Sequence, residues 1–244
     1  MKKYVNLFVF VFMIGACFSQ GKAQTKSTMS YKNPVVDIAM PDPTVIKAAD
    51  GYFYVYATES TRNVPIMKSK DLVEWTYCNT AFTNKTRPRF EPKAGIWAPD
   101  INYISGKYVL YYAMSVWGGE QTCGIGVATA DSPQGPFMDH GKMFRSNEIG
   151  VQNSIDPSLL QYEGRNYLVW GSFRGIYVIE LTADGLSLMP GAEKKKIAGT
   201  AFEAAYVHKH GDYYYMFASI GSCCRGVEST YKVVVGRSKK VWGP

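Results

Sequence analysis

The stretch that decides the fold reads Ile155-Asp156-Pro157-Ser158-Leu159-Leu160, then Tyr162-Glu163-Gly164, then Tyr167-Leu168-Val169-Trp170-Gly171. An acidic residue followed by proline opens a short apolar run, and a second run rich in aromatic residues returns after a glycine turn. The Glu-Gly pair supplies the positive φ angle that a tight turn requires. The stretch therefore predicts a β-hairpin with a carboxylic acid at its head.

The same pattern occurs three more times along the chain. The other heads are Pro41-Asp42-Pro43-Thr44-Val45-Ile46, Ala98-Pro99-Asp100-Ile101-Asn102-Tyr103-Ile104 and Phe202-Glu203-Ala204-Ala205-Tyr206-Val207. Each leads into a glycine-containing turn and a tyrosine-rich return strand; the turns are Asp50-Gly51, Ser105-Gly106 and His210-Gly211. Repetition at a period of roughly 50 residues is typical of propellers and solenoids.

A third apolar run follows every hairpin, at residues 65–69, 124–129, 175–180 and 233–238. A polar turn and a shorter amphipathic stretch come next, at residues 70–76 and 131–137 in the first two units. Four antiparallel strands per unit make one propeller blade, and β-branched and aromatic residues favour strands. No part of the sequence has the pattern of a long amphipathic helix. We therefore predict an all-β propeller formed by residues 33–244 as one domain.

The four heads carry Asp42, Asp100, Asp156 and Glu203. The first strands of all blades line the propeller axis and point the same way, so residues in register meet at one end of the channel. A single acid at a strand start usually caps a turn. Four acids in register place like charges together, and their repulsion destabilises the fold unless the acids serve a function. The pattern therefore predicts a functional site.

Residues 1–23 have the pattern of an export signal, with Lys2 and Lys3 before an apolar core that is too short for a stable anchor. Gly21-Lys22-Ala23 fits a peptidase site that would release a soluble protein, whereas Ile14-Gly15-Ala16-Cys17 resembles a bacterial lipobox. We slightly favour the lipobox, in which Cys17 would be lipidated and anchor the protein to a membrane. Either site predicts export, as a cell-surface or periplasmic lipoprotein or as a secreted protein. The polar composition of residues 24–32 predicts a disordered linker.

The formal charge is +7 and is spread along the sequence, with residues 194–196 as the only lysine run. We interpret that run as a solvated loop and predict no nucleic-acid partner. An exported protein permits disulfides, and the cysteines have no metal-ligand spacing. Cys223 and Cys224 could form a vicinal disulfide or remain two thiols.

The sequence resembles glycoside hydrolase family 43, and within that family it resembles the endo-α-1,5-L-arabinanase branch. The resemblance covers essentially the whole chain after the leader. It rests on Pro41-Asp42-Pro43, Gly95-Ile96-Trp97-Ala98-Pro99-Asp100-Ile101, Asn153-Ser154-Ile155-Asp156-Pro157-Ser158, Gly171-Ser172-Phe173 with Gly175-Ile176-Tyr177, Phe202-Glu203-Ala204, Gly221-Ser222-Cys223-Cys224-Arg225-Gly226-Val227-Glu228-Ser229-Thr230-Tyr231 and Val235-Gly236-Arg237-Ser238. The long block around the cysteine pair is the most specific to the branch.

The resemblance implies a five-bladed β-propeller with a groove across one face, of which this sequence supplies about four blades. Residues 236–244 align with 128–136 and stop before the equivalent of Phe137. We expect the sequence to be incomplete, and the four blades alone to be unstable because two sheet edges are open. No cofactor is expected for the chemistry and no metal ligand is assigned. The family often holds a structural calcium ion at the axis through a fifth-blade histidine, which this sequence does not include.

The resemblance implies an inverting hydrolysis with three acids in distinct roles. Asp42 would be the general base that activates water, Glu203 the general acid, and Asp156 the group that raises and tunes the pKa of that acid. Inversion requires base and acid about 6.5–9.5 Å apart, a separation that strands of different blades can supply. A neighbouring carboxylate favours the protonated form of an acid through like-charge repulsion. Asp100 is interpreted as structural.

Aromatic residues commonly stack on sugar rings. Trp97 and Trp117 are placed near the acid-bearing face and are candidate substrate contacts, and Asn153 and Ser172 are candidates for contacts with sugar hydroxyls. His208 and His210 are interpreted as solvent-facing turn residues.

The leading hypothesis is endo-acting hydrolysis of arabinan or arabino-oligosaccharides. One alternative is an exo-acting α-L-arabinofuranosidase or β-xylosidase on the same scaffold, because loops decide whether the groove is closed. Another is a non-catalytic propeller that binds glycans through Trp97 and Trp117. The presence of all three acids argues against the binding module.

Overall fold

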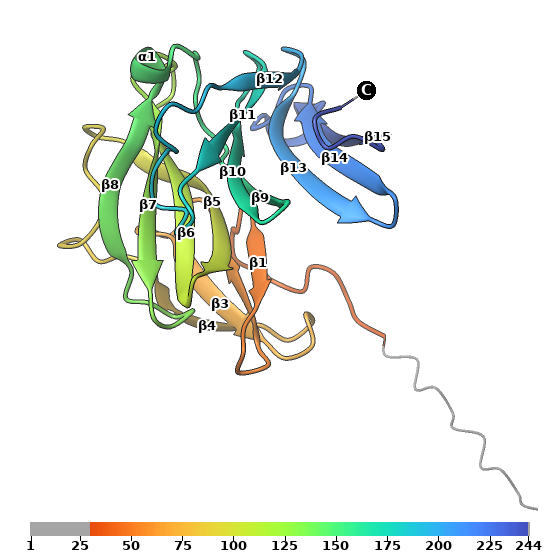
Figure 1. Cartoon of the computed structure of the whole chain (residues 1–244). Coiled ribbons are helices and arrows are strands. Elements are labelled where there is room, and N and C mark those ends of the chain that lie inside the picture. The colour runs from red at the N-terminus through yellow and green to blue at the C-terminus, as the bar shows by residue number, and fades with distance from the viewer. Residues whose placement is uncertain (1–29, 244) are drawn as a thin grey trace, which may run out of the picture. The chain divides into compact units, whose positions relative to one another are not determined.

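The computed structural model describes residues 30–243, in which the strands form four antiparallel sheets (Figure 1). The first sheet holds β1 (Thr44–Lys47), β2 (Phe53–Tyr56), β3 (Pro65–Ser69) and β4 (Thr76–Thr80). The second holds β5 (Gly95–Ile104), β6 (Lys107–Ser115), β7 (Gly124–Ala130) and β8 (Met138–Arg145). The third holds β9 (Ser158–Tyr162), β10 (Arg165–Trp170), β11 (Ile176–Leu181) and β12 (Lys195–Ala198). The fourth holds β13 (Glu203–His210), β14 (Tyr213–Ile220) and β15 (Lys232–Ser238).

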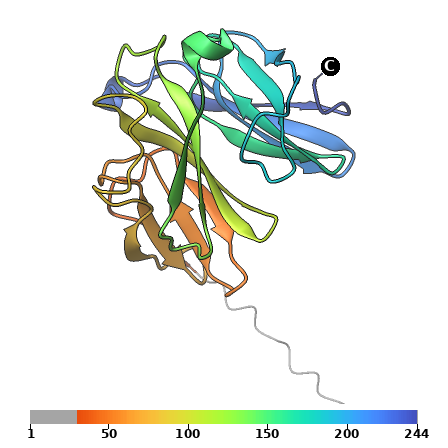
Figure 2. The same cartoon turned by 60° about the vertical axis from the view of Figure 1, so that its left-hand side comes forward.

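The sheets are arranged as propeller blades. Strand β1 contacts β5, β5 contacts β9, and β9 contacts β13, so the first strand of each sheet lies beside the first strand of the next. Figures 1 and 2 show the successive sheets fanning away from these first strands. The predicted all-β fold and its blade repeat are therefore confirmed. Within residues 30–243 the helical segments are short, namely α1 (Ser146–Ile149) and a 3-10 turn at Gly226–Glu228.

The predicted hairpin turns are present. In the third blade Tyr162 pairs with Arg165, which leaves Glu163 and Gly164 as a two-residue loop with φ angles of 49° and 73°. Two successive positive φ angles define the turn whose twist matches antiparallel strands, and glycine adopts the second without steric cost. Ser105 and Gly106 form the same turn in the second blade.

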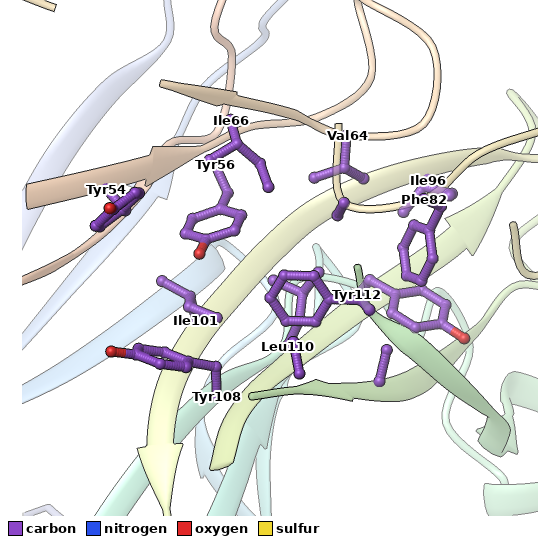
Figure 3. Close-up of a cluster of buried hydrophobic side chains, with 14 of the residues drawn as sticks. Tyr54, Tyr56, Val64, Ile66, Phe82, Ile96, Ile101, Tyr108, Leu110 and Tyr112 are labelled. Atoms are coloured by element: carbon purple, nitrogen blue, oxygen red, sulfur yellow. The ribbon is translucent and has the colours of Figure 1, made fainter. Parts of the chain in front are cut away.

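The core consists of apolar layers between neighbouring blades. Figure 3 shows the layer between the first and second sheets, where Tyr54, Tyr56 and Ile66 face Leu110 and Tyr112. The layer between the second and third sheets includes the Phe144 and Trp170 rings, 5.1 Å apart. A smaller layer, with Val169 and Val178 against Ala205 and Val207, joins the third and fourth sheets. Each hairpin is thus stabilised by burying apolar area against the next blade.

Three details differ from the predictions. Residues 70–75 and 131–137 form turns, and the fourth strands begin later, at Thr76 and Met138. The Asp71 carboxylate accepts hydrogen bonds from the Val73 and Glu74 N–H groups, so it closes a turn where a strand was predicted. In the described part of the chain the fourth sheet has three strands. Residues 195 and 196 of the lysine run are exposed but lie in strand β12 (Lys195–Ala198) instead of a loop.

His208 and His210 are exposed, as predicted, but they lie in strand β13 and pair with Tyr215 and Tyr213 instead of lying in the turn. The predicted leader and most of the predicted linker lie outside the described residues. No helix in residues 30–243 is long and apolar enough to cross a membrane.

Candidate active site

The heads of the four first strands share one backbone feature that sets their true alignment. Asp42, Ala98, Asp156 and Ala204 all have left-handed φ angles, between 40° and 58°. Two residues beyond each of them, the hairpin pairing either begins, at Thr44 and Ser158, or resumes after an irregularity, at Asp100 and Tyr206.

The prediction that four acids lie in register is therefore wrong. Asp42 and Asp156 are equivalent, whereas Asp100 lies two residues further along its strand and Glu203 one residue earlier than Ala204. Irregularities between Trp97 and Asp100, and between Glu203 and Tyr206, cause these offsets. An aspartate tolerates the left-handed conformation better than most residues, which is consistent with Asp42 and Asp156 at these turns.

The structure brings Asp42, Asp156 and Glu203 together. Burial raises the pKa of the Asp156 carboxyl well above its ordinary value, and the charges of Glu203 and Asp42 raise it further. Asp156 is therefore close enough to Glu203 and to Asp42 for their charges to disfavour its ionised form.

Glu203 is held by a short chain of hydrogen bonds. The Ser172 hydroxyl donates to Glu203 Oε2 at 2.6 Å, and Asn153 Nδ2 donates to Ser172 Oγ at 2.9 Å. Ser172 is buried and its hydroxyl is committed to Glu203. The predicted sugar contact at Ser172 is therefore replaced by a role in orienting Glu203. Asn153 is half-buried, and its contact with sugar stays a prediction.

Asp42 is exposed to solvent and is oriented by Thr58, which sequence reasoning did not single out. The Thr58 hydroxyl donates to Asp42 Oδ2 at 2.5 Å and accepts a hydrogen bond from the Ala98 N–H at 2.7 Å. The Thr58 N–H donates to the Pro41 carbonyl at 2.9 Å. Its place just after the first return strand was the only sequence signal, because the bond to Ala98 joins residues 40 apart in the chain.

Tyr231 was also missed as a site residue. It lies in the loop between β14 and β15, and burial together with the charges of Glu203 and Asp156 raises the pKa of its phenol. It belongs to the sequence block that carries the branch resemblance. The same loop contains Cys223 and Cys224, which form a disulfide in the structure.

Asp100 joins three blades through the hydrogen bonds of its carboxylate. Asp100 Oδ2 accepts hydrogen bonds from the Leu159 N–H and from Asn102 Nδ2, both at 2.7 Å, and Oδ1 accepts one from the Thr44 hydroxyl at 3.4 Å. Burial raises the pKa of Asp100 to about 6. This arrangement agrees with the structural interpretation of Asp100.

Trp97 and Trp117 form an aromatic pair beside the acids. Their ring centroids are 5.5 Å apart, and Trp117 is 79% exposed. Trp97 is half-buried and packs against Ile155, the residue before Asp156. The exposed ring of Trp117 presents an apolar face of the kind on which a sugar ring stacks.

No group of three or more histidine, cysteine, aspartate or glutamate side chains in residues 30–243 has a metal-binding arrangement. The structural calcium ion implied by the resemblance stays a prediction.

Comparison with known proteins decides the family. The model of the glycosyl hydrolases family 43 matches residues 31–244. The chain belongs to this family. Within family 43, it is 37% identical over 217 residues to an extracellular endo-α-(1→5)-L-arabinanase of Bacillus subtilis, covering 83% of this chain and 66% of that protein. It is 34% identical over 231 residues to an extracellular exo-α-(1→5)-L-arabinofuranosidase of Cellvibrio japonicus, covering 83% and 65%.

Solved family 43 structures have the same fold. The Cellvibrio cellulosa α-L-arabinanase in complex with arabinohexaose superposes with a TM-score of 0.75 at 32% identity, over 85% of this chain and 73% of that one. The chain spans just under two thirds of the length of the two curated relatives.

Proposed function

We propose that the protein is an inverting glycoside hydrolase that cleaves internal α-1,5-L-arabinofuranosidic bonds of arabinan. The observation that carries this proposal is the grouping of Asp42, Asp156 and Glu203, with the pKa of Asp156 raised by burial and by the other two acids. A module that only binds glycans gains nothing from three mutually repelling carboxyls.

In the proposed mechanism Asp42 is the general base. It is open to solvent and its carboxylate is fixed by Thr58, so it can accept a proton from a water molecule. The oxygen of that water attacks the anomeric carbon on the face opposite the leaving group, which inverts the configuration.

Glu203 is the general acid, and donates its proton to the glycosidic oxygen as the bond to the anomeric carbon breaks. Ser172 and Asn153 fix its orientation. The carboxylates of Asp156 and Glu203 repel each other, so we propose that the two share one proton before reaction. After one turnover Asp42 holds a proton and Glu203 has lost one, and exchange with water restores both.

The similarity to the Bacillus subtilis relative, named an endo-arabinanase, supports internal cleavage. The Trp97–Trp117 pair supplies a platform for an arabinose ring next to the acids. Export is supported by the relatives named extracellular, and we propose the same location for this protein. The candidate lipid anchor at Cys17 remains part of this proposal.

Exo-action is the second candidate, because a Cellvibrio japonicus relative and a solved enzyme from a ruminal metagenomic library, 33% identical with a TM-score of 0.74, carry exo names. Product analysis of linear α-1,5-arabinan with the full-length protein separates the candidates. Mixed oligomers are expected early in the reaction. A monomer or a single short product would instead establish exo-action, and the absence of any product would reject hydrolysis of arabinan.

A further inference from the structure

A separate hollow opens where the first and second sheets meet. It has a volume of about 410 Å³ and is lined by Arg62 of the β2–β3 loop, by residues 87–94 except Phe90 of the β4–β5 loop, and by Met114 of β6. We call it the basic pocket. The function proposed above assigns it no role.

Two of the lining residues, Arg87 and Glu91, belong to ion pairs, of which the first is buried and the second partly buried. Arg87 pairs with Glu59 at 2.8 Å, and Glu91 pairs with Arg145. Arg87 also donates to the Asn63 side chain at 2.8 Å. These charges compensate one another, so neither pair attracts a ligand by its net charge.

The rim is different, because it carries three cations without counter-charges. Arg62, Arg89 and Lys93 are exposed, and none of them forms an ion pair within the described residues. Unpaired cations around one concave surface give it a positive potential that favours an anionic group.

The two arginines on the rim are already oriented. Arg62 Nε donates to Asn84 Oδ1 at 3.0 Å, and Arg89 Nη2 donates to the Asn84 carbonyl at 2.8 Å. A guanidinium has five N–H donors in a rigid fork, so most donors of each arginine are left for a ligand. Such a fork matches a carboxylate, which can accept two parallel hydrogen bonds.

The basic pocket is connected through Glu59 to the residues that hold Asp42. Glu59, which pairs with Arg87, also accepts a hydrogen bond from the Ile96 N–H at 3.0 Å. Its chain neighbour Thr58 binds the Asp42 carboxylate. The neighbouring residues Thr58 and Glu59 therefore link Asp42 to the basic pocket, and we expect one polysaccharide chain to contact both.

The remaining lining residues are apolar and include Pro88, Pro92 and Met114. Apolar walls suit the C–H faces of a sugar ring. We propose that the basic pocket is a subsite for a carboxylate-bearing sugar, a uronic acid unit attached to the arabinan that the enzyme cleaves. The inference rests on the proposed function for its substrate, but the binding itself is independent of catalysis.

The test measures binding of three probes to the full-length protein by calorimetry: a linear trimer of galacturonic acid, arabinotriose and inorganic phosphate. The acidic trimer is expected to bind the basic pocket. The triple variant Arg62→Gln, Arg89→Gln and Lys93→Gln is expected to weaken it about tenfold or more, since charge-assisted hydrogen bonds are lost. A matched triple variant removes the same charge far from the pocket, near the hairpin turns that join the first and second strands of the sheets: Lys47→Gln, Lys70→Gln and Lys209→Gln. This variant should retain wild-type affinity for the acidic trimer.

Three binding outcomes would overturn the proposal: no binding of the acidic trimer, equal binding by wild type and the pocket variant, or phosphate binding as tight as the trimer. Lys93→Gln alone, which leaves the Asn84 contacts intact, gives the same test if the triple variant does not fold.

A second readout compares kcat/KM for an arabino-oligosaccharide that carries a terminal uronate with kcat/KM for its neutral counterpart. The ratio should fall in the pocket variant and stay at the wild-type value in the matched variant. Equal losses on both substrates would overturn the proposal. If arabinan is not cleaved but the trimer binds in the pocket-dependent way, the proposed function fails and the subsite stands.

Discussion

At the residue scale, three carboxylic acids occupy three different environments. Asp42 is open to water and held by Thr58, Glu203 is half-buried and held by Ser172, and Asp156 is the group whose pKa burial and neighbouring charge raise most clearly. Chemically identical groups can therefore take separate roles, because environment decides which one holds the proton.

Glu203→Ala removes the proposed proton donor. Hydrolysis of arabinan, whose leaving alkoxide is poor, should fall about 10³-fold, within the usual range for loss of general acid–base help. An aryl arabinofuranoside with a good leaving group needs little protonation, so its rate should fall much less. Steady-state kinetics on both substrates makes the comparison.

Asp42→Ala is the matched control, because loss of the base should slow both substrates alike. If Glu203→Ala slows both substrates equally, or hydrolyses arabinan at a near-native rate, then Glu203 is not the acid.

Thr58 is a positioning residue for Asp42. Thr58→Val removes the hydroxyl that binds Asp42 and accepts the Ala98 N–H, so kcat should fall about tenfold through loss of one charge-assisted hydrogen bond. Thr58→Ser keeps the hydroxyl and should restore most of the activity. A valine variant with wild-type kcat would show that the hydrogen bond does not matter, and a serine variant as slow as the valine variant would show that the hydroxyl alone is not sufficient at this position.

At the scale of elements, the first strands do more than carry the acids. Asp100 on β5 accepts hydrogen bonds from the Leu159 N–H at the start of β9 and, more weakly, from Thr44 of β1. It joins three blades and so helps to fix how the first strands lie relative to one another.

Asp100 should make stability depend on pH. Burial raises its folded pKa from 3.8 to about 6. Folding thus favours the protonated form of Asp100. The contribution of this proton to the free energy of unfolding is fully present below the unfolded pKa and is lost as pH rises through about 6. The loss is about 3 kcal/mol for a shift of about two units.

Urea unfolding of wild type and Asp100→Asn at pH 4 and pH 7.5 measures this effect, because other titrating groups largely cancel between the two proteins. The stability of wild type relative to the variant should decrease toward pH 7.5. A difference that is constant or increases with pH would contradict the assigned pKa direction.

Two glycines in third strands are a matched pair for packing between strands. A Cβ atom at Gly124 of β7 would lie 2.3 Å from the Phe144 carbonyl oxygen, whereas one at Gly236 of β15 would meet nothing within 4 Å. Gly124→Ala should destabilise the fold by about 1–3 kcal/mol through overpacking. Gly236→Ala should stay within about 0.5 kcal/mol of wild type. Similar losses in thermal unfolding at both positions would refute the steric explanation.

At the scale of the whole molecule, the proposed export leaves two forms of the protein to distinguish, a lipid-anchored form and a soluble one. Cys17→Ala should move it from the membrane fraction to the soluble exported pool if Cys17 carries a lipid anchor. Fractionation of cells expressing each form, with immunodetection, makes the measurement. Unchanged distribution would instead favour cleavage after Ala23.

The repeat of acid, apolar run, glycine turn and aromatic run determined the strand order, the hairpins and the fold class. These features are local, since alternation and turn chemistry act over a few residues. The same repeat located Asp42, Asp156 and Glu203, because equivalent strands of a propeller must meet at its axis.

Tertiary structure alone decided the register at the heads and the partners of each acid. The offsets of Asp100 and Glu203 arise from irregularities in strand pairing, which repeat spacing cannot reveal. The hydrogen bonds between Thr58 and Asp42, between Ala98 and Thr58, and between Ser172 and Glu203 join residues 16, 40 and 31 positions apart. The charge of the basic pocket likewise depends on which of its cationic side chains form ion pairs with carboxylates. Such pairings are set by how the blades pack against one another, and no local pattern encodes them.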